Sequence, residues 1–253
     1  MIHEVFTVEG PATIEVSMLS GSLTLVEGNE STVEVTVDTS RPEPWRVTKS
    51  GTTISVACER FGFGSGGRAT IRIVAPPRSA LRAEAASASV TSHVDLGQVN
   101  VKTASGDIEF RNTGSAAVKT ASGELTIKRV DGDLAVKSAS GDIDVDSASG
   151  SVAITTASGD VSIREVSGPF AASSASGDVR IVRYVGEDLE VATMSGDIAF
   201  GVPARTSVKL TATTLSGDVT LPERAQGSGP ALRHISAQVK SVSGDIRLQR
   251  LDP

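Results

Sequence analysis

Eight acidic residues recur in one sequence context and are the strongest candidates for chemistry in this chain. Each follows a Ser-Gly pair, and together they form what we call the acidic ladder: Asp107, Glu124, Asp142, Asp160, Asp178, Asp197, Asp218 and Asp245. Carboxylates and the carbonyl oxygens of turns are the ligands that calcium prefers. One interpretation of the acidic ladder is therefore a row of cation sites.

A second interpretation is that these side chains cap turns by accepting hydrogen bonds from backbone N–H groups, as Asp often does. The calcium-binding nonapeptide repeats carry G-G-x-G-x-D, whereas here the second glycine is missing. Lysines four residues before the corner glycine, such as Lys102 and Lys119, are placed to screen the charge. We therefore favour turn capping, keep the acidic ladder as the one metal candidate, and predict no cofactor and no catalytic or cofactor-binding residues.

Hydroxyl side chains form a second recurring set. Its members are Thr103, Thr120, Ser138, Thr156, Ser174 and Thr193. A flat hydroxyl face of this kind occurs in ice-binding solenoids, but no regular T-x-T pair accompanies it here. We expect these hydroxyls to satisfy hydrogen bonds at the corners of the fold.

The remaining candidates for an active site are weak. Residues 61–67 (F-G-F-G-S-G-G) resemble a phosphate-binding loop but lack the following Lys-Ser/Thr and helix pattern. His3, His93 and His234 show no metal-ligand spacing. Catalysis needs a unique constellation of side chains, whereas most polar residues here are repeated, so we predict that the protein is not an enzyme.

The elements that position these residues follow from a short sequence period. Between Gly97 and Gly196, glycines recur at steps of 8 to 10 residues. After each glycine, apolar residues stand at the second, fourth and often the seventh position, as in Ile143, Val145 and Ala148. Alternation over a few residues followed by a turn is typical of a short strand. A fixed short period of this kind indicates a solenoid.

The period is doubled, because Ser-Gly-acid corners alternate with corners of looser sequence. The predicted fold is therefore an all-β parallel β-solenoid with coils of about 18 residues, each containing two short strands and two corners. Val, Ile and Leu side chains of the strands are expected to form the core. Small alanines at the seventh position, such as Ala139 and Ala157, are expected to let the two walls approach.

The chain divides into two predicted regions. Residues 1–84 form an irregular β-rich cap or wide first coils, in which Trp45 packs, and residues 85–253 form the regular solenoid. Ala75-Pro76-Pro77 marks the transition, because consecutive prolines do not fit inside a sheet. Loop insertions are expected after about residue 200, the most probable at 222–230, and the polar segment 247–252 is expected to blunt the last coil.

Composition excludes several classes of partner. The net charge of −6 without a basic cluster argues against nucleic acid, and no apolar run is long enough for a membrane span. The start of the chain has no signal-peptide pattern, and Cys58 is the single cysteine. We expect a cytoplasmic location, or a cell-surface or secreted one if residues that precede this sequence have been removed.

The corner sequence T-A-S-G-D-[IV], following a less regular β-rich region, resembles the bacterial β-strand-repeat putative adhesin family, a domain of unknown function. The resemblance is clearest from Ser105 to Asp218. It implies a β-solenoid (β-helix-like) repeat protein, and it offers no catalytic residues. Some relatives carry signal or membrane segments and are linked to envelope stress.

Three functions are compatible with these observations. The first is a non-enzymatic, adhesin-like scaffold or binding module that presents a repetitive polar surface to a protein or cell-envelope partner. The second is a self-assembling structural solenoid, and the third is a calcium- or glycan-binding surface module. For the first we expect a monomer or a small homo-oligomer.

Overall fold

The computed structural model describes residues 1–42, 45–58, 68–222 and 232–251. All 22 of its elements are strands, and the part of the chain so described contains no helix that could cross a membrane. The sequence-based predictions for residues 61–67, for most of the 222–230 loop and for Asp252 fall outside the described residues. The chain forms two compact units, Met1–Arg129 and Val130–Pro253, which we call the N-terminal and C-terminal units. The predicted division at residue 84 stays a prediction.

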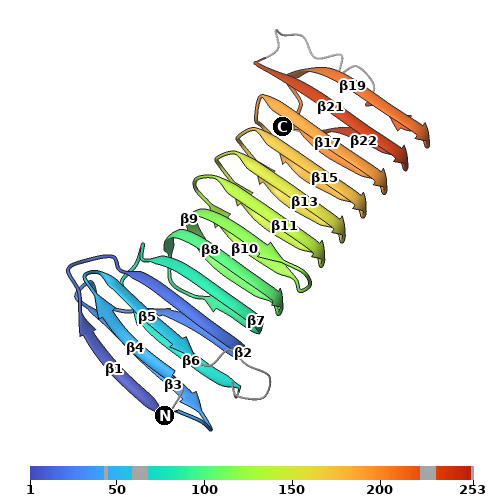
Figure 1. Ribbon diagram of the computed structural model, residues 1–253. Coiled ribbons are helices and arrows are strands. Elements are labelled where there is room, and N and C mark those ends of the chain that lie inside the picture. The colour runs from blue at the N-terminus through green and yellow to red at the C-terminus, as the bar shows by residue number, and fades with distance from the viewer. Residues whose placement is uncertain (43–44, 59–67, 223–231, 252–253) are drawn as a thin grey trace. The chain divides into compact units, whose positions relative to one another are not determined.

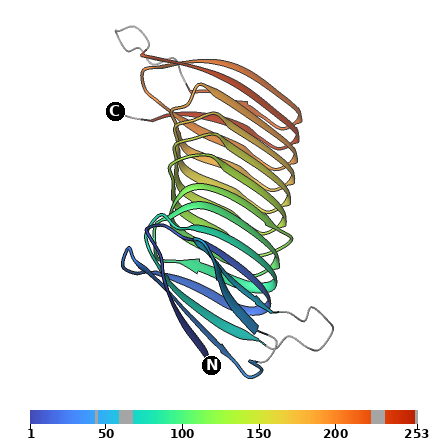
Figure 2. The ribbon, with the colours of Figure 1, turned by 60° about the vertical axis from the view of Figure 1, so that its left-hand side comes forward.

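The C-terminal unit is a parallel β-solenoid, as predicted (Figures 1 and 2). Its coils have two walls, and strands of one wall pair in parallel from coil to coil. The first wall contains β11 (Leu134–Ser140), β13 (Val152–Ser158), β15 (Phe170–Ser176), β17 (Asp188–Ser195), β19 (Thr206–Ser216) and β21 (Arg233–Ser243). The second wall contains β12 (Ile143–Ala148), β14 (Val161–Val166), β16 (Val179–Tyr184), β18 (Ile198–Pro203), β20 (Val219–Thr220) and β22 (Ile246–Leu251).

The register confirms the coil of about 18 residues. Leu134 lies beside Val152, and Val152 lies beside Phe170, so equivalent residues stack in columns. The predicted inner residues are buried: Ile143 and Val161, which neighbour each other across coils, are 2% and 1% exposed. Because each coil contributes only a few such side chains, its core is completed by its neighbours.

The order of coils at the end of this unit differs from the order of the chain. Strand β21 pairs with β17 on one side and β19 on the other, and β22 pairs with β18 and β20. Figure 1 shows β21 between β17 and β19. The coil formed by β19 and β20, which we call the end coil, is therefore the outermost one. The prediction that the polar segment after Ile246 blunts the last coil is wrong, because β22 lies inside the stack.

The prediction for the small alanines is only partly correct. Ala148 is 1% exposed and faces the core, as expected. Ala139 and Ala157 are exposed, and the residues before them, Ser138 and Thr156, are buried instead. The seventh position therefore faces inward on the second wall only, since on the first wall the strand ends at an acid corner and the alanine points outward.

The N-terminal unit combines coils with antiparallel strands. Strand β2 (Thr13–Glu27) contains a corner at Gly21 and pairs in parallel with β5 (Thr53–Cys58), β6 (Ala69–Ala75) and β7 (Ala80–Ser92). Strands β8 (Leu96–Ser105) and β9 (Ile108–Thr120) continue the parallel ladder, and β10 (Leu125–Val130) ends at the first residue of the next unit.

Three strands at the start of the chain pair in the antiparallel direction. Strand β3 (Thr32–Thr39) lies between β1 (Ile2–Thr7) and β6, and β4 (Trp45–Ser50) pairs with β5. Trp45 is buried, as expected, and Pro76 and Pro77 lie between β6 and β7. The pairing of these strands was not predicted, because their residues alternate without the nine-residue period that recurs later in the chain.

Candidate functional site

Both corner types need glycine because neighbouring backbones approach closely, and the acid corners need it for a second reason, their backbone conformation. Gly159, in an acid corner, has φ +127°, a conformation that L side chains rarely adopt. Gly168, in an intervening corner, has no such backbone angle, but a Cβ there would lie 2.1 Å from the carbonyl oxygen of Gly150 in the preceding coil. A Cβ on Gly159 would likewise lie 2.4 Å from the Gly141 carbonyl oxygen, so close approach is common to both corners and positive φ marks the acid corners.

The acidic ladder lies on the acid corners and connects one coil to the next by hydrogen bonds. In every ladder aspartate except Asp218, the Oδ1 atom accepts a hydrogen bond from the backbone N–H of the ladder residue in the neighbouring coil. The donor–acceptor pairs are Glu124–Asp107 (3.1 Å), Asp160–Asp142 (2.9 Å), Asp178–Asp160 (2.8 Å), Asp197–Asp178 (2.7 Å), Asp245–Asp197 (2.8 Å) and Asp218–Asp245 (2.8 Å). As in turn capping, the carboxylates accept hydrogen bonds from backbone N–H groups. These bonds join neighbouring coils rather than residues of a single turn.

The same contact also occurs at an intervening corner. The N–H of Ser151 donates to Oδ1 of Asp133 at 3.0 Å. Asp133 was not predicted because it follows Asp131-Gly132 rather than a Ser-Gly pair, although an acid after a corner glycine was the available signal.

A cation site on the acidic ladder stays a hypothesis. Within residues 1–42, 45–58, 68–222 and 232–251, no three His, Cys, Asp or Glu side chains gather in a way that could hold a metal ion. One oxygen of each bonded aspartate already accepts a backbone hydrogen bond. Calcium would therefore have to use the remaining oxygens along an exposed column.

The threonines and serines of the recurring hydroxyl set differ in their hydrogen bonds. Thr103, Thr120, Thr156 and Thr193 each donate from Oγ1 to the carbonyl oxygen two residues later, at 2.8 to 3.1 Å. Ser138 and Ser174 are buried, and their hydroxyls have no hydrogen-bond partner among the described residues. The expectation that these hydroxyls satisfy hydrogen bonds at the corners is confirmed for the four threonines and is wrong for these two serines.

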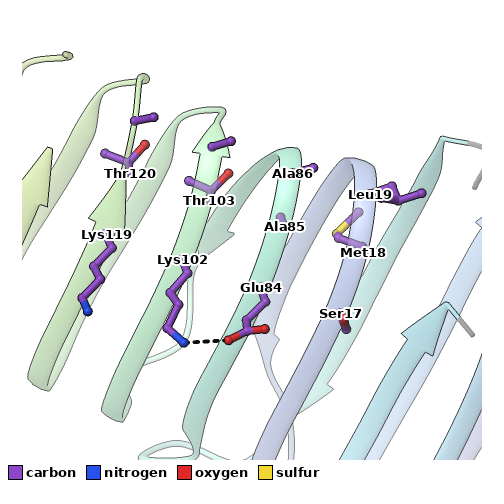
Figure 3. A pocket seen from close by; sticks show the side chains of 12 residues that line it. Ser17, Met18, Leu19, Glu84, Ala85, Ala86, Lys102, Thr103, Lys119 and Thr120 are labelled. Carbon is purple, nitrogen blue, oxygen red and sulfur yellow. Dashed lines mark hydrogen bonds and ion pairs between the residues drawn. The ribbon is translucent and has the colours of Figure 1, made fainter. Parts of the chain in front are cut away.

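The N-terminal unit carries a shallow hollow of about 540 Å³ at the outer side of its corners, which we call the corner groove (Figure 3). Its lining residues come from β2, β7, β8, β9 and the residue after β9: Ser17, Met18, Leu19, Glu84, Ala85, Ala86, Lys102, Thr103, Ala104, Lys119, Thr120 and Ala121. One row of these residues is apolar and consists of Leu19, Ala86, Ala104 and Ala121. The groove was not predicted from the sequence, and its lysines were expected only to screen charge.

A charged row flanks the apolar row of the corner groove. In register, Glu84 lies beside Lys102, and Lys102 lies beside Lys119. Lys102 Nζ is 2.8 Å from Glu84 Oε1, and both side chains are exposed (Figure 3). No residue in the described parts of the chain forms an ion pair with Lys119, so its ammonium is available to a partner.

The C-terminal unit has a larger open hollow, of about 1120 Å³, at its intervening corners. It is lined by polar residues that the repeat does not contain, among them Glu187, Asp188, Arg233 and His234. Arg233 donates to the Val185 carbonyl at 3.0 Å. This hollow brings His234 together with acidic residues, a proximity that their separation in the sequence does not indicate.

Tyr184 lies next to this hollow and has a structural role. The side chain is 0% exposed, and its hydroxyl donates to the Asp188 carbonyl. Burial raises the pKa of the Tyr184 hydroxyl far above its ordinary value, and the negative charges of Asp188 and Glu187 add to the effect. The hydroxyl therefore stays protonated and acts as a hydrogen-bond donor, not as a base.

The sequence profile of the Toastrack DUF4097 family matches residues 12–252. The chain belongs to this family. Toastrack membership agrees with the predicted resemblance to a bacterial domain of unknown function with adhesin-like relatives. No match was found among curated proteins.

Solved structures similar to this Toastrack chain have low sequence identity to it, and the two with TM-scores above 0.5 share its fold. A "putative lipid binding protein" from Parabacteroides distasonis is 13% identical with a TM-score of 0.54, covering 97% of this chain and 96% of the other. A "putative adhesin" from Parabacteroides merdae is 12% identical with a TM-score of 0.51, covering 98% and 95%. A "putative adhesin" from Bacteroides fragilis is 13% identical with a TM-score of 0.46, covering 98% and 96%.

Proposed function

We propose that this chain is a non-enzymatic binding module that presents its corner surface to a protein or cell-envelope partner. The corner groove carries the proposal. It combines exposed small apolar side chains with an unpaired ammonium at Lys119, whereas the repeated Asp and Thr groups of the corners are occupied by backbone hydrogen bonds. Within the groove, Lys119 and the exposed alanines are therefore the groups that are free to bind.

The chemistry of the corner groove indicates the kind of partner. The charges of Lys102 and Glu84 compensate each other, so Lys119 supplies the net positive charge beside the apolar row. This arrangement suits an acidic group placed next to an apolar one. Fold neighbours described as a "putative adhesin" and as a "putative lipid binding protein" are compatible with a binding role, and they do not identify the ligand.

Binding to isolated bacterial cell envelopes tests the proposal. We expect the wild-type protein to bind, and Lys119→Glu to weaken binding by about tenfold, since one favourable charge contact becomes a repulsion. The matched control is Lys128→Glu, which makes the same charge change on an exposed side chain of β10 outside the groove. Protease treatment of the envelopes would separate a protein partner from a lipid or polysaccharide. Absence of binding, or equal loss in both variants, would overturn the proposal.

A further inference from the structure

The end coil of the C-terminal unit leaves one edge without a strand partner. β19 pairs with β21 from Thr206 to Ser216, and β20 pairs with β22. Within residues 130–222 and 232–251 no strand pairs with the opposite edge of either. An exposed edge of this length is a template for another strand, because its N–H and C=O groups are unpaired.

The end coil continues the core columns of the inner coils up to this edge. Leu210 lies beside Ala237, Ala212 beside Val239, and Val219 beside Ile246. The inner partners are fully buried, whereas Val219 is 43% exposed. Leu221, which follows β20, is 55% exposed. The end coil thus presents an apolar cross-section, although terminal repeats of soluble solenoids usually have a polar outer face.

The acidic ladder ends at the same edge. In the C-terminal unit each preceding ladder carboxylate accepts a backbone N–H from the next coil, and Asp245 accepts that of Asp218. No described residue donates a hydrogen bond to the Asp218 carboxylate. The groups that join one coil to another are therefore present on the end coil but unused.

We propose that a second copy of this chain covers the end coil, with the two β19 strands antiparallel across a two-fold axis. A two-fold contact uses the same edge in both copies and closes on itself, so it forms a dimer and not a filament. The strand alternates half-buried Val208, Leu210 and Ala212 with exposed Lys209 and Thr211. Alternation with period two keeps the apolar residues of both copies on the core side.

The side chains of β19 are compatible with this pairing. If Thr211 lies on the two-fold axis, Leu210 faces Ala212 of the second copy, and Lys209 faces Thr213 of the second copy. Lys209 is the single charged residue between Thr206 and Ser216, so no like charges oppose each other in this register. β19 contains neither several charges nor a proline, and its register with β21 has no bulge, so the usual protections of an edge are missing from it.

Sedimentation velocity over about 1 to 200 µM, a range that covers typical weak dimers, tests the proposal. The wild-type protein is expected to form a dimer, and Leu210→Lys is expected to remain monomeric throughout this range. Val5→Lys is the control, because Val5 is 57% exposed on β1 of the N-terminal unit and its change should leave the dimer intact. A monomeric wild type, a dimer that survives Leu210→Lys, or a dimer lost in Val5→Lys would overturn the proposal.

A charge pair at an exposed position separates the interface from effects on folding. Thr213 is exposed, so both Thr213→Lys and Thr213→Glu should fold. Thr213→Lys places the new lysine opposite Lys209 twice, by symmetry, and should weaken the dimer by about tenfold at low salt. Thr213→Glu should weaken it less or strengthen it. Equal dissociation constants for the two variants would contradict this register.

Discussion

Threonine and serine differ at the same corner position of this solenoid. Thr156 Oγ1 donates to the Ser158 carbonyl at 3.1 Å, whereas the Ser174 hydroxyl, one coil away, has no partner among the described residues. Two heavy atoms on Cβ restrict χ1 of threonine, which favours one orientation of its hydroxyl. The methyl group of threonine thus helps to aim the hydrogen bond, and serine lacks this constraint.

Alanine substitutions at these two positions should have different effects on stability. Thr156→Ala removes a hydrogen bond and a buried methyl group, and should lower the free energy of unfolding by about 1–2 kcal/mol. Ser174→Ala removes a buried hydroxyl without a partner, and should leave that free energy unchanged or raise it slightly. Urea unfolding followed by circular dichroism measures both. Equal losses would show that the serine hydroxyl is also satisfied, for example by water.

Glycine substitutions should separate close backbone approach from backbone conformation. Gly168→Ala places a Cβ 2.1 Å from the Gly150 carbonyl oxygen, so neighbouring coils must move apart, at a cost of about 3 kcal/mol or more. The control is Gly51→Ala, where φ is +60° but no heavy atom lies within 4 Å of the new Cβ. That change should cost only about 1–2 kcal/mol, from the left-handed conformation alone. Thermal melts compare the two, and a milder effect at Gly168 would contradict the close packing.

At the scale of strands, the inner residues of each coil could be predicted because the pattern repeats. Ile143 and Val145 were assigned to the core from alternation and are buried. The order of the last coils could not be predicted. The three corners at Gly196, Gly217 and Gly244 carry the same Ser-Gly-Asp sequence, so each fits any of the last positions in the stack. The pairing of β21 with β17 depends on tertiary packing, which the local sequence does not specify.

The corner groove was missed for a related reason. Its apolar row combines Leu19 of β2 with Ala86 of β7, which are distant in the sequence and are brought together by the β2–β7 register. A single nine-residue period shows which residues point outward, but not which columns leave a hollow. The irregular strands in residues 1–84 lack this nine-residue period, so their register could not be predicted from the sequence.

A polar substitution inside a strand should disrupt more than one coil. Ile143→Asp buries a carboxylate beside Val161 of the next coil and should lower the free energy of unfolding by about 3–5 kcal/mol. Asp144→Asn changes the neighbouring exposed residue of the same strand and should alter it by less than about 0.5 kcal/mol. Chemical denaturation of both variants tests the inside–outside assignment. Similar losses for the two would contradict it.

At the scale of the whole molecule, the chain carries a net charge of −6, and its acidic ladder places carboxylates on successive coils. Like charges at this spacing repel each other, and the repulsion is screened by salt. The hydrogen bonds that the carboxylates accept from backbone N–H groups offset part of this cost. The ladder therefore holds coils together locally, while its charge opposes stability at low ionic strength.

This balance predicts a general effect of salt and no special effect of calcium. The melting temperature should rise as sodium chloride increases from about 10 to 200 mM, because the Debye length falls from about 30 Å to below 10 Å. Calcium chloride should give the same melting temperature as magnesium chloride at equal concentration, since one oxygen of each bonded aspartate is already used. A calcium-specific rise that disappears with chelator, and that is reduced by Asp160→Asn, would instead establish the acidic ladder as a cation site. Because Asn can still accept the Asp178 N–H, that variant tests the charge of the column without removing its hydrogen bond.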